Sequence, residues 1–175
     1  LLYNKGISKF VKIKESSKVI ANAAFINNSV IEEVDFPEGI LEIGDRCFEN
    51  CVSLEKVNIS EGLERIGNDT FKNSKLKKVK LPESIVTIGY GAFNNCKELE
   101  YINLPHRIES IAAYNFENTL YLKNMKTDEF GCKYADNILL DVVDNGVKKI
   151  KIKDGTRVIA AETFANNKDI EEVFI

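Results

Sequence analysis

Hydrophobic and polar residues recur along this chain with a fixed period. A phenylalanine followed two positions later by an asparagine occupies the same place in the pattern at Phe25, Phe48, Phe71, Phe93, Phe116 and Phe164. The differences between successive phenylalanine numbers are 23, 23, 22, 23 and 48, and the last is close to two periods. Self-similarity at such a period indicates a repeat protein in which each repeat forms one structural unit.

Each repeat contains two short apolar segments. The first has the spacing of Leu54, Val57 and Ile59, whose alternation with polar residues is typical of a short half-buried strand. The second, such as Leu63 and Ile66, precedes a glycine or alanine, where we expect a positive φ or a close backbone approach. Since neither segment can bury itself, we expect stacked coils about 4.8 Å apart. Each 22–23-residue coil then carries one main parallel strand, with short second strands or 3-10 turns on the other side.

The other repeat positions have predicted structural roles. The phenylalanines are expected to fill the wide end of each coil. The asparagines are expected to satisfy backbone groups at a turn, as a ladder from coil to coil. Pro37, Pro82 and Pro105 directly follow the first strand. Because proline has no N–H to donate, the strand ladder is expected to stop there.

The stretch 117–146 departs from the repeat. Two apolar runs, 138–143 and 147–152, flank Asp144-Asn145-Gly146, which predicts a β-hairpin around that turn. The sequence that starts at position 139 then parallels the start of the chain, with Phe164 in the place of Phe25. We therefore interpret residues 1–175 as a single solenoid domain with one irregular or hairpin insertion at about 117–146.

The two ends of the chain predict that the domain is a fragment of a longer array. It starts with Leu1-Leu2-Tyr3 rather than with methionine, and neither end carries a polar cap. An uncapped flat strand edge templates association with another chain. We expect the terminal coils either to fray or to pair end to end with another copy.

The whole pattern resembles a known repeat family. It can be written L-x-x-V-x-[IL]-P-E-x-[IL]-x-x-I-G-x-x-x-F-x-N, and residues 48–57 and 93–100 match the most characteristic stretch of the family. On these residues the chain resembles the BspA-like leucine-rich repeat family, a variant found in bacterial surface proteins and some protist ones. The resemblance implies a mainly β leucine-rich-repeat solenoid of the α/β class. It also implies a secreted or cell-surface protein, in which such arrays are associated with adhesion to host or matrix components.

Composition and charge exclude several classes of protein. Hydrophobic residues make up 44% and charged residues 29% of the chain, unlike a disordered protein. With 24 Lys+Arg against 27 Asp+Glu, the net charge of −3 argues against a nucleic-acid or anionic-membrane partner. No apolar run approaches the roughly 18 to 20 residues that span a bilayer. We therefore expect no nucleic-acid binding and no membrane insertion.

The sequence offers little for catalysis. His106 is the one histidine, and it occupies a position that carries glutamate in neighbouring repeats, so we interpret it as a solvated surface residue. A glycine-rich phosphate loop and a nucleophile elbow are both absent from the sequence. Catalysis would require acidic side chains from several coils to converge in one pocket. We predict a protein that is not an enzyme, with no catalytic residues and no cofactor.

The four cysteines are interpreted as buried, reduced thiols that fill small apolar spaces. Cys51 and Cys96 occupy the same repeat position two coils apart, which is about 9.6 Å and exceeds the roughly 7 Å limit for a disulfide. Cys47 lies in a small-residue core position, and Cys132 lies in the irregular stretch. The spacing Cys47-x3-Cys51 suits zinc, but no second pair or histidine lies near. We predict no metal site.

The outward positions of the main strands carry charges that often alternate in sign from coil to coil, as with Lys12 beside Asp35. Two interpretations stay open. The face is either a solvated, charge-paired surface that blocks aggregation, or a surface that binds a protein or glycan. Under the second, the predicted ligand-binding residues are Glu33, Asp35, Lys56, Asn58, Lys78, Lys80, Tyr101 and Asn103.

Two functions follow from these interpretations. The first is a non-catalytic binding or adhesion module whose ligand, such as a host or matrix component, lies on the charged face. The second is a passive spacer or stalk that presents another domain of the parent protein. Unpaired lysines beside a cleft near Tyr101 would favour binding. A fully paired face without an exposed aromatic patch would favour the spacer.

Overall fold

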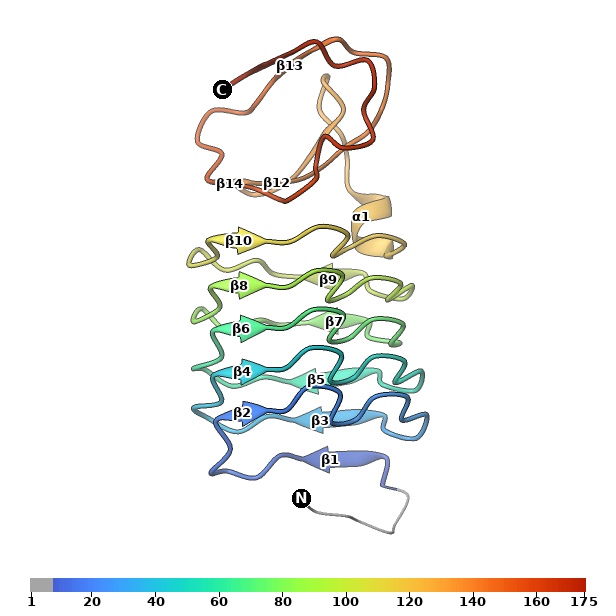
Figure 1. Ribbon diagram of the computed structural model, residues 1–175, viewed down its shortest axis with the longest axis vertical. Coiled ribbons are helices and arrows are strands. Elements are labelled where there is room, and N and C mark those ends of the chain that lie inside the picture. The colour runs from blue at the N-terminus through green and yellow to red at the C-terminus, as the bar shows by residue number, and fades with distance from the viewer. Residues whose placement is uncertain (1–7) are drawn as a thin grey trace.

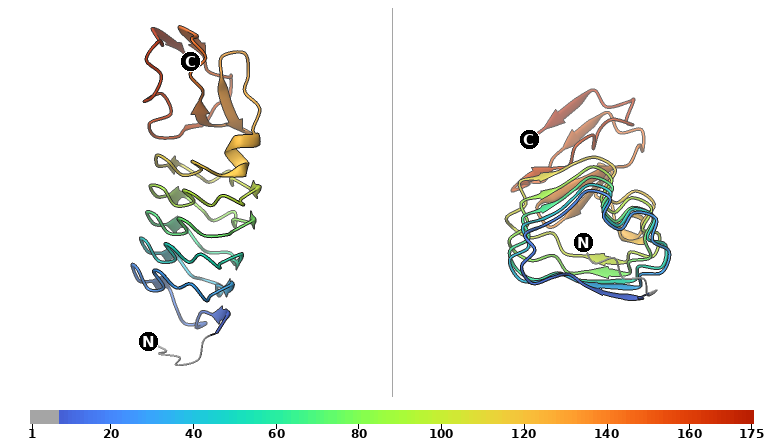
Figure 2. Two further views of the ribbon diagram at one scale, coloured as in Figure 1. Left: turned by 90° about the vertical axis from the view of Figure 1, so that its right-hand side faces the viewer. Right: turned by 60° about the horizontal axis from the view of Figure 1, so that its bottom comes forward.

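Each repeat forms one coil of an elongated solenoid in the computed structural model, which describes residues 8–175 (Figure 1). Viewed toward the end of the stack, the regular coils lie almost over one another (Figure 2). Strands alternate between two faces along the chain, so that odd-numbered strands up to β9 lie on one face and even-numbered strands up to β10 on the other. The predicted mainly β solenoid is confirmed.

The first face is built from strands of two or three residues whose central or second side chain points inward. Its strands are β1 (Phe10–Lys12), β3 (Glu33–Asp35), β5 (Lys56–Asn58), β7 (Lys78–Val79) and β9 (Tyr101–Ile102). β1, β3 and β5 pair in parallel, and β7 pairs in parallel with β9. No ladder joins β5 to β7, where the repeat between Phe71 and Phe93 is shorter by one position. The predicted main strand of each coil is therefore present, but this face is not one continuous sheet.

The second face is a continuous five-stranded parallel sheet. Its strands are β2 (Val19–Ile20), β4 (Glu42–Ile43), β6 (Arg65–Ile66), β8 (Thr87–Ile88) and β10 (Ser110–Ile111). The isoleucines of neighbouring strands lie in register, as Ile43 and Ile66 do, and both are fully buried. These are the short second strands that the second apolar pair of each repeat predicts.

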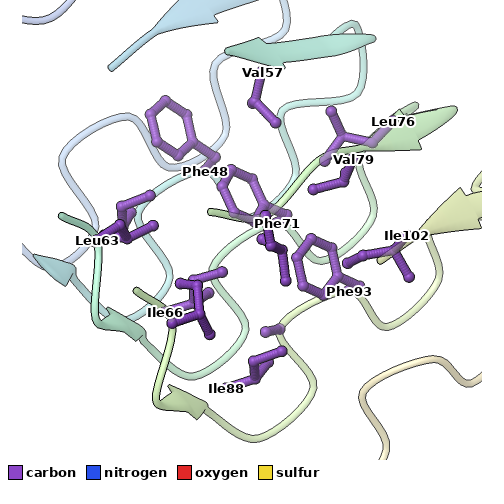
Figure 3. Close-up of a cluster of buried hydrophobic side chains, with 14 of the residues drawn as sticks. Phe48, Val57, Leu63, Ile66, Phe71, Leu76, Val79, Ile88, Phe93 and Ile102 are labelled. Carbon is purple, nitrogen blue, oxygen red and sulfur yellow. The ribbon is translucent and has the colours of Figure 1, made fainter. Parts of the chain in front are cut away.

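Stacked phenylalanine rings run through the core between the two faces (Figure 3). Ring centroids are 5.0 Å apart for Phe25 and Phe48, 5.6 Å for Phe48 and Phe71, 5.4 Å for Phe71 and Phe93, and 6.0 Å for Phe93 and Phe116. The rings are close to parallel, with interplanar angles of 6° to 18°. Such spacings are typical of offset-stacked aromatic pairs. The predicted interior role of these phenylalanines is confirmed for five of the six.

The repeated asparagines are structural, by two effects at once. Asn27, Asn50 and Asn73 have φ values of 60°, 59° and 62°, in the left-handed region that asparagine tolerates better than most residues. Their amides also bond to one another along the stack. Asn50 Nδ2 donates to Asn27 Oδ1 at 2.8 Å, and Asn73 Nδ2 donates to Asn50 Oδ1 at 2.6 Å. The predicted ladder exists, but its bonds join side chains rather than side chain and backbone.

The glycines after the second strand are required by close packing between coils. A Cβ at Gly67 would lie 2.6 Å from the Asp45 nitrogen and 2.7 Å from the Gly44 carbonyl carbon. Gly89 meets the preceding coil in the same way. Of the two reasons expected for glycine here, close approach is therefore correct and positive φ is not.

A second side-chain ladder follows these glycines and was not predicted. Asn22 Oδ1 accepts from the Asp45 N–H at 2.9 Å, and Asp45 Oδ1 accepts from the Asn68 N–H at 2.8 Å. Asn68 Oδ1 in turn accepts from the Tyr90 N–H at 2.8 Å. Each side chain thus satisfies the backbone of the next coil at a point where the strands have ended.

The irregular stretch forms a short helix and a hairpin, but not the hairpin that the sequence predicts. α1 (Leu120–Asn124) is followed by β11 (Cys132–Ala135), which pairs antiparallel with β12 (Ile138–Val142). β13 (Lys149–Lys151) pairs instead in parallel with β15 (Glu172–Phe174). The predicted pairing of 138–143 with 147–152 is therefore wrong.

The turn chemistry explains this error. The chain reverses at Asp136, whose φ is 51°, between β11 and β12. At the expected hairpin turn, Asn145 Oδ1 accepts from the Val147 N–H at 3.1 Å, and Gly146 has a φ of 76°. That turn leads into the next coil and does not fold the chain back on β12. The asparagine-glycine pair therefore forms a turn, as predicted, but the turn does not connect two strands of a hairpin.

β12 separates two hydrophobic cores. Ile138 belongs to the core of the regular coils, whereas Leu139 and Val142 belong to a second core. A strand that is buried on both sides has a nearly continuous apolar sequence, as this one does. β14 (Val158–Ile159) pairs in parallel with β12, and Ala161 beyond it donates its N–H to the Ile111 carbonyl of the last regular coil.

The second core contains Cys132, Leu139, Val142, Ile150 and Ile152. Phe164 packs against it, so the sixth repeated phenylalanine lies outside the stack of the other five. The insertion thus closes the end of the first core.

We expect the substitution Phe71→Ala to cost about 3–5 kcal/mol of unfolding free energy, because it leaves a cavity between Phe48 and Phe93. Amide exchange should accelerate most in the coils next to Phe71, since each coil contacts only its neighbours. Phe174→Ala is the matched control, because that ring is 50% exposed, and it should cost less than about 1 kcal/mol. Equal loss of protection in every coil would contradict the stacking account.

Candidate binding surface

The eight predicted ligand-binding residues lie together on the first face, on or directly after four consecutive strands. Glu33 and Asp35 belong to β3, Lys56 and Asn58 to β5, Lys78 to β7 and Tyr101 to β9, while Lys80 and Asn103 follow their strands. The pairing of β3 with β5 and of β7 with β9 brings residues of neighbouring coils side by side. The surface divides into two parts at the missing ladder between β5 and β7.

In the part on β3 and β5, the charged and polar side chains bind one another. Lys56 Nζ lies 2.6 Å from Glu33 Oε1, and Asn58 Nδ2 donates to the same oxygen at 2.7 Å and to Asp35 Oδ1 at 2.5 Å. The hydrogen bonds from Lys56 and Asn58 lower the pKa of Glu33, and the bond to Glu33 raises the pKa of Lys56. The charge of Lys56 is therefore already paired within the protein, and Glu33, Asp35 and Asn58 are held by bonds to neighbouring side chains.

The part on β7 and β9 is different. Within residues 8–175, neither Lys78 nor Lys80 forms an ion pair, although the adjacent Lys77 lies 3.1 Å from Glu55 and 3.8 Å from Glu98. Lys78 and Lys80 are exposed, and the ring of Tyr101 beside Lys78 is 52% exposed. Two free ammonium groups and an uncovered aromatic ring thus lie on one patch.

Asn103 is not part of that patch. Its Oδ1 accepts from the Leu81 N–H at 2.7 Å, and its Nδ2 donates to the Leu81 carbonyl at 2.9 Å. The side chain therefore replaces a strand residue and extends the pairing between β7 and β9 past their ends. We assign it a structural role, which leaves Lys78, Lys80 and Tyr101 as the candidate contact residues.

The residues considered for catalysis and metal binding lie apart. His106 is exposed at a turn, and the part of the chain that the structure describes has no group of three or more His, Cys, Asp or Glu arranged to hold a metal ion. All four cysteines are free and buried. Cys51 Sγ donates to the Phe25 carbonyl at 3.2 Å, and Cys96 Sγ does the same to Phe71 at 3.1 Å, so both act as weak donors within the stack.

The structure also contains a cleft that the sequence analysis did not identify. It lies at the junction between the last regular coil and the layer of β12 and β14, and its walls come from residues 111–117, 122, 140–142, 160–163 and 166. Because these segments are far apart along the chain, no local pattern signals the cleft.

Coils with a strand on each of two faces, stacked around a column of phenylalanines, define this chain as a leucine-rich-repeat solenoid. Such repeat arrays are generally binding or structural elements. The chain belongs to the BspA-type leucine-rich repeat family, since the sequence model of that family, a region of six copies, matches residues 2–123 and 64–175. No curated protein matches the sequence.

Solved bacterial leucine-rich repeat structures share the fold at low sequence identity. The leucine-rich repeat protein of T. pallidum is 20% identical with a TM-score of 0.63, over 96% of this chain and 74% of that one. The pneumococcal vaccine antigen PcpA is 17% identical with a TM-score of 0.60, over 96% of this chain and 60% of that one. A leucine-rich cell surface protein of Faecalibacterium prausnitzii is 18% identical with a TM-score of 0.51, over 97% and 70%. Within residues 8–175, no helix has the length and apolar character needed to cross a membrane.

We expect the free energy of unfolding to fall as the pH rises from about 9 toward 11–12. Burial raises the pKa of Cys47 to about 12 and those of Cys51 and Cys96 to about 11, from an ordinary value of 9.0. The unfolded chain therefore loses thiol protons that the native chain keeps, which favours unfolding at high pH. The stabilisation is complete below the unfolded pKa and is lost as the pH rises through the folded one.

Urea unfolding between pH about 8 and 10.5 tests this expectation. The double variant Cys51→Ser, Cys96→Ser is the matched comparison, because Ser74 already occupies the same repeat position, where its Oγ lies 3.2 Å from Cys96 Sγ. Its unfolding free energy should depend less on pH than that of the original chain. Identical pH dependence in both would show that the thiols contribute nothing.

Proposed function

We propose that this chain is a non-catalytic binding region of a secreted or cell-surface protein, and that it binds a protein or glycan ligand through Lys78, Lys80 and Tyr101. The observation that carries the proposal is the contrast within one face. The charges on β3 and β5 pair with each other, and those of Lys78 and Lys80 do not. A ligand with anionic groups fits this patch.

Physical reasons favour a contact at this place. Exposed lysines without partners leave their charge available to a ligand, and long flexible side chains can adjust to it. Tyrosine supplies a large amphipathic contact area at a small entropic cost, which is why it is enriched in binding surfaces. The stacked core beneath keeps the backbone of β7 and β9 in place, since Val79 and Ile102 are buried in it.

The surface location is supported by two structural relatives. One is described as a leucine-rich cell surface protein and another as a pneumococcal vaccine antigen. Both cover nearly all of this chain, although this chain covers only 70% and 60% of them. Their identities to this chain are only 18% and 17%, so the location comes to this chain as a proposal that rests on a shared fold.

The triple variant Lys78→Ala, Lys80→Ala, Tyr101→Ala tests the binding patch. We expect binding to an immobilised sulfated glycan or to a polyglutamate peptide to weaken at least about tenfold and to fall with added salt, while the melting temperature changes little. The matched control is Lys9→Ala, Phe10→Ala, Lys12→Ala, because these residues lie on the same face but the lysines already pair with Glu32 and Glu15. Unchanged binding in the first variant would reject the patch.

A passive spacer is the second candidate function. It is favoured by ion pairs elsewhere on the solenoid, such as Lys148 with Glu171 at 2.6 Å and Lys149 with Glu172 at 3.0 Å. Paired surface charges keep the surface of the solenoid hydrated and leave no net charge that would attract a partner. If the chain binds neither probe and tolerates the triple variant without effect, the spacer role replaces the binding role.

End-to-end pairing of the terminal coils remains a prediction. Val173 and Phe174 on β15 are 43% and 50% exposed, as expected of a strand with a partner on one edge only. Sedimentation equilibrium at increasing concentration tests it. Self-association that disappears in the variant Val173→Lys would support pairing through this edge, and a monomer at all concentrations would exclude it.

A further inference from the structure

The junction cleft has the size of a small ligand site. Its volume is about 200 Å³, and it lies between the coil that contains Phe116 and the layer of β12 and β14, which Figure 1 shows directly above β10. Ligand pockets for drug-sized molecules have volumes of about 300–1,000 Å³. The cleft therefore holds a single small ring or a chain end rather than an extended ligand.

One wall of the cleft is aromatic. Tyr114 lines it, and the neighbouring ring of Tyr90 lies 5.4 Å away between centroids at an interplanar angle of 63°. Tyr90 is 46% exposed and Tyr114 is 38% exposed, so neither side chain is buried in the core. Leu140 and Val142 also line the cleft and provide apolar surface.

The polar lining is acidic. Glu117, Asp141 and Glu162 all line the cleft, and Glu117 and Asp141 each have one partner in the protein. Asn94 Nδ2 donates to Glu117 at 2.9 Å, and Lys133 Nζ lies 3.1 Å from Asp141. A carboxylate has two oxygens with about four acceptor positions, so each keeps capacity for a further donor.

The third carboxylate is tied to the aromatic wall. The nearby Glu162 carboxylate raises the pKa of Tyr114, so the Tyr114 hydroxyl stays protonated. Tyr114 lies on the last regular coil and Glu162 lies after β14, so the two sides of the junction both contribute to the lining. The exposed amide of Asn166 adds a donor and an acceptor to the same lining.

The aromatic side chain of Tyr114, and not its backbone, sets it apart from the same position in other coils. Its φ is 58°, in the left-handed region where a bulky residue is uncommon. The equivalent positions of the other coils hold Ala23, Arg46, Asp69, Gly91 and Glu162, with φ values of 55°, 56°, 49°, 56° and 59°. Each coil has this left-handed conformation at the equivalent position, and residues without an aromatic ring adopt it in the other coils. Tyr114 is therefore a costly choice for the coil alone, which points to a use for its side chain.

We infer that this cleft binds one pyranose unit of a glycan, with no carboxylate or sulfate on that unit. Sugar hydroxyls donate hydrogen bonds to carboxylates, and the C–H face of a pyranose packs on an aromatic ring. The three carboxylates repel an acidic sugar and accept a neutral or an amino sugar. The site differs from the patch of Lys78, Lys80 and Tyr101, which favours an anionic ligand.

The test uses NMR of the 175-residue chain with methyl glycosides of glucose, galactose, mannose and N-acetylglucosamine, together with glucosamine and glucuronate. We expect saturation transfer from the protein to the ring protons of at least one neutral or amino sugar. The amide shifts that accompany it should centre on Tyr114, Glu117 and Glu162. Glucuronate should bind at least about tenfold more weakly.

Tyr114→Asn is the decisive variant, because asparagine suits a left-handed backbone and keeps the coil intact while the ring is lost. It should weaken sugar binding at least about tenfold and keep or raise the melting temperature. Arg46→Asn makes the same exchange at the equivalent position three coils away and should leave sugar binding unchanged. Lys78→Ala, Lys80→Ala, Tyr101→Ala should also leave it unchanged, which separates this site from the proposed binding patch.

Three results would overturn the inference. The first is the absence of transfer to every neutral and amino sugar. The second is binding that Tyr114→Asn does not alter. The third is a preference for glucuronate, because it would show that the carboxylates do not govern selection.

Discussion

No coil of this protein can bury its own apolar side chains or pair its own strands, and the remaining structure depends on that constraint. Strands of two or three residues find their hydrogen-bonding partners only in the adjacent coil, as β4 does in β2 and β6. Phe48 lies between Phe25 and Phe71 for the same reason. The close approach at Gly67 and the left-handed Asn50 are consequences, because identical coils at strand spacing leave no room for a Cβ at one point and require a tight turn at the other.

The sequence predicts the regular coils well because their period is itself the structure. The spacing of the phenylalanines predicts which side chains form the core, and the alternation around Val57 predicts the strands of the first face. The prediction failed where tertiary context decides between equal local signals. Asn145 and Gly146 form a turn, as expected, but the partner of β12 is β11 because β12 is buried between two cores. The ladder between β5 and β7 is missing where the repeat from Phe71 to Phe93 is one residue shorter. The shorter spacing can be seen in the sequence, but the loss of strand pairing beside it cannot.

The same limits apply to the candidate sites. Strand register predicts which residues share the outer face, and Glu33, Lys56, Lys78 and Tyr101 do share it. It does not predict which side chains satisfy each other, so the side-chain bonds of Glu33 and the backbone bonds of Asn103 appear only in the structure. The cleft depends on contact between segments that the insertion brings together. The insertion therefore both closes the first core and creates a concave surface that a regular solenoid lacks.

Deleting one whole period tests the central claim most directly, since residues 49–71 comprise 23 positions and their removal joins Phe48 to Lys72 in the same repeat phase. Urea unfolding of this shortened chain, monitored by circular dichroism, should remain cooperative, with an m-value lower by about one eighth because the surface exposed on unfolding falls in proportion. Removing residues 60–71 alone breaks the phase and should prevent folding. A chain without 49–71 that fails to fold, or a chain without 60–71 that folds equally well, would contradict the account of interchangeable stacked coils.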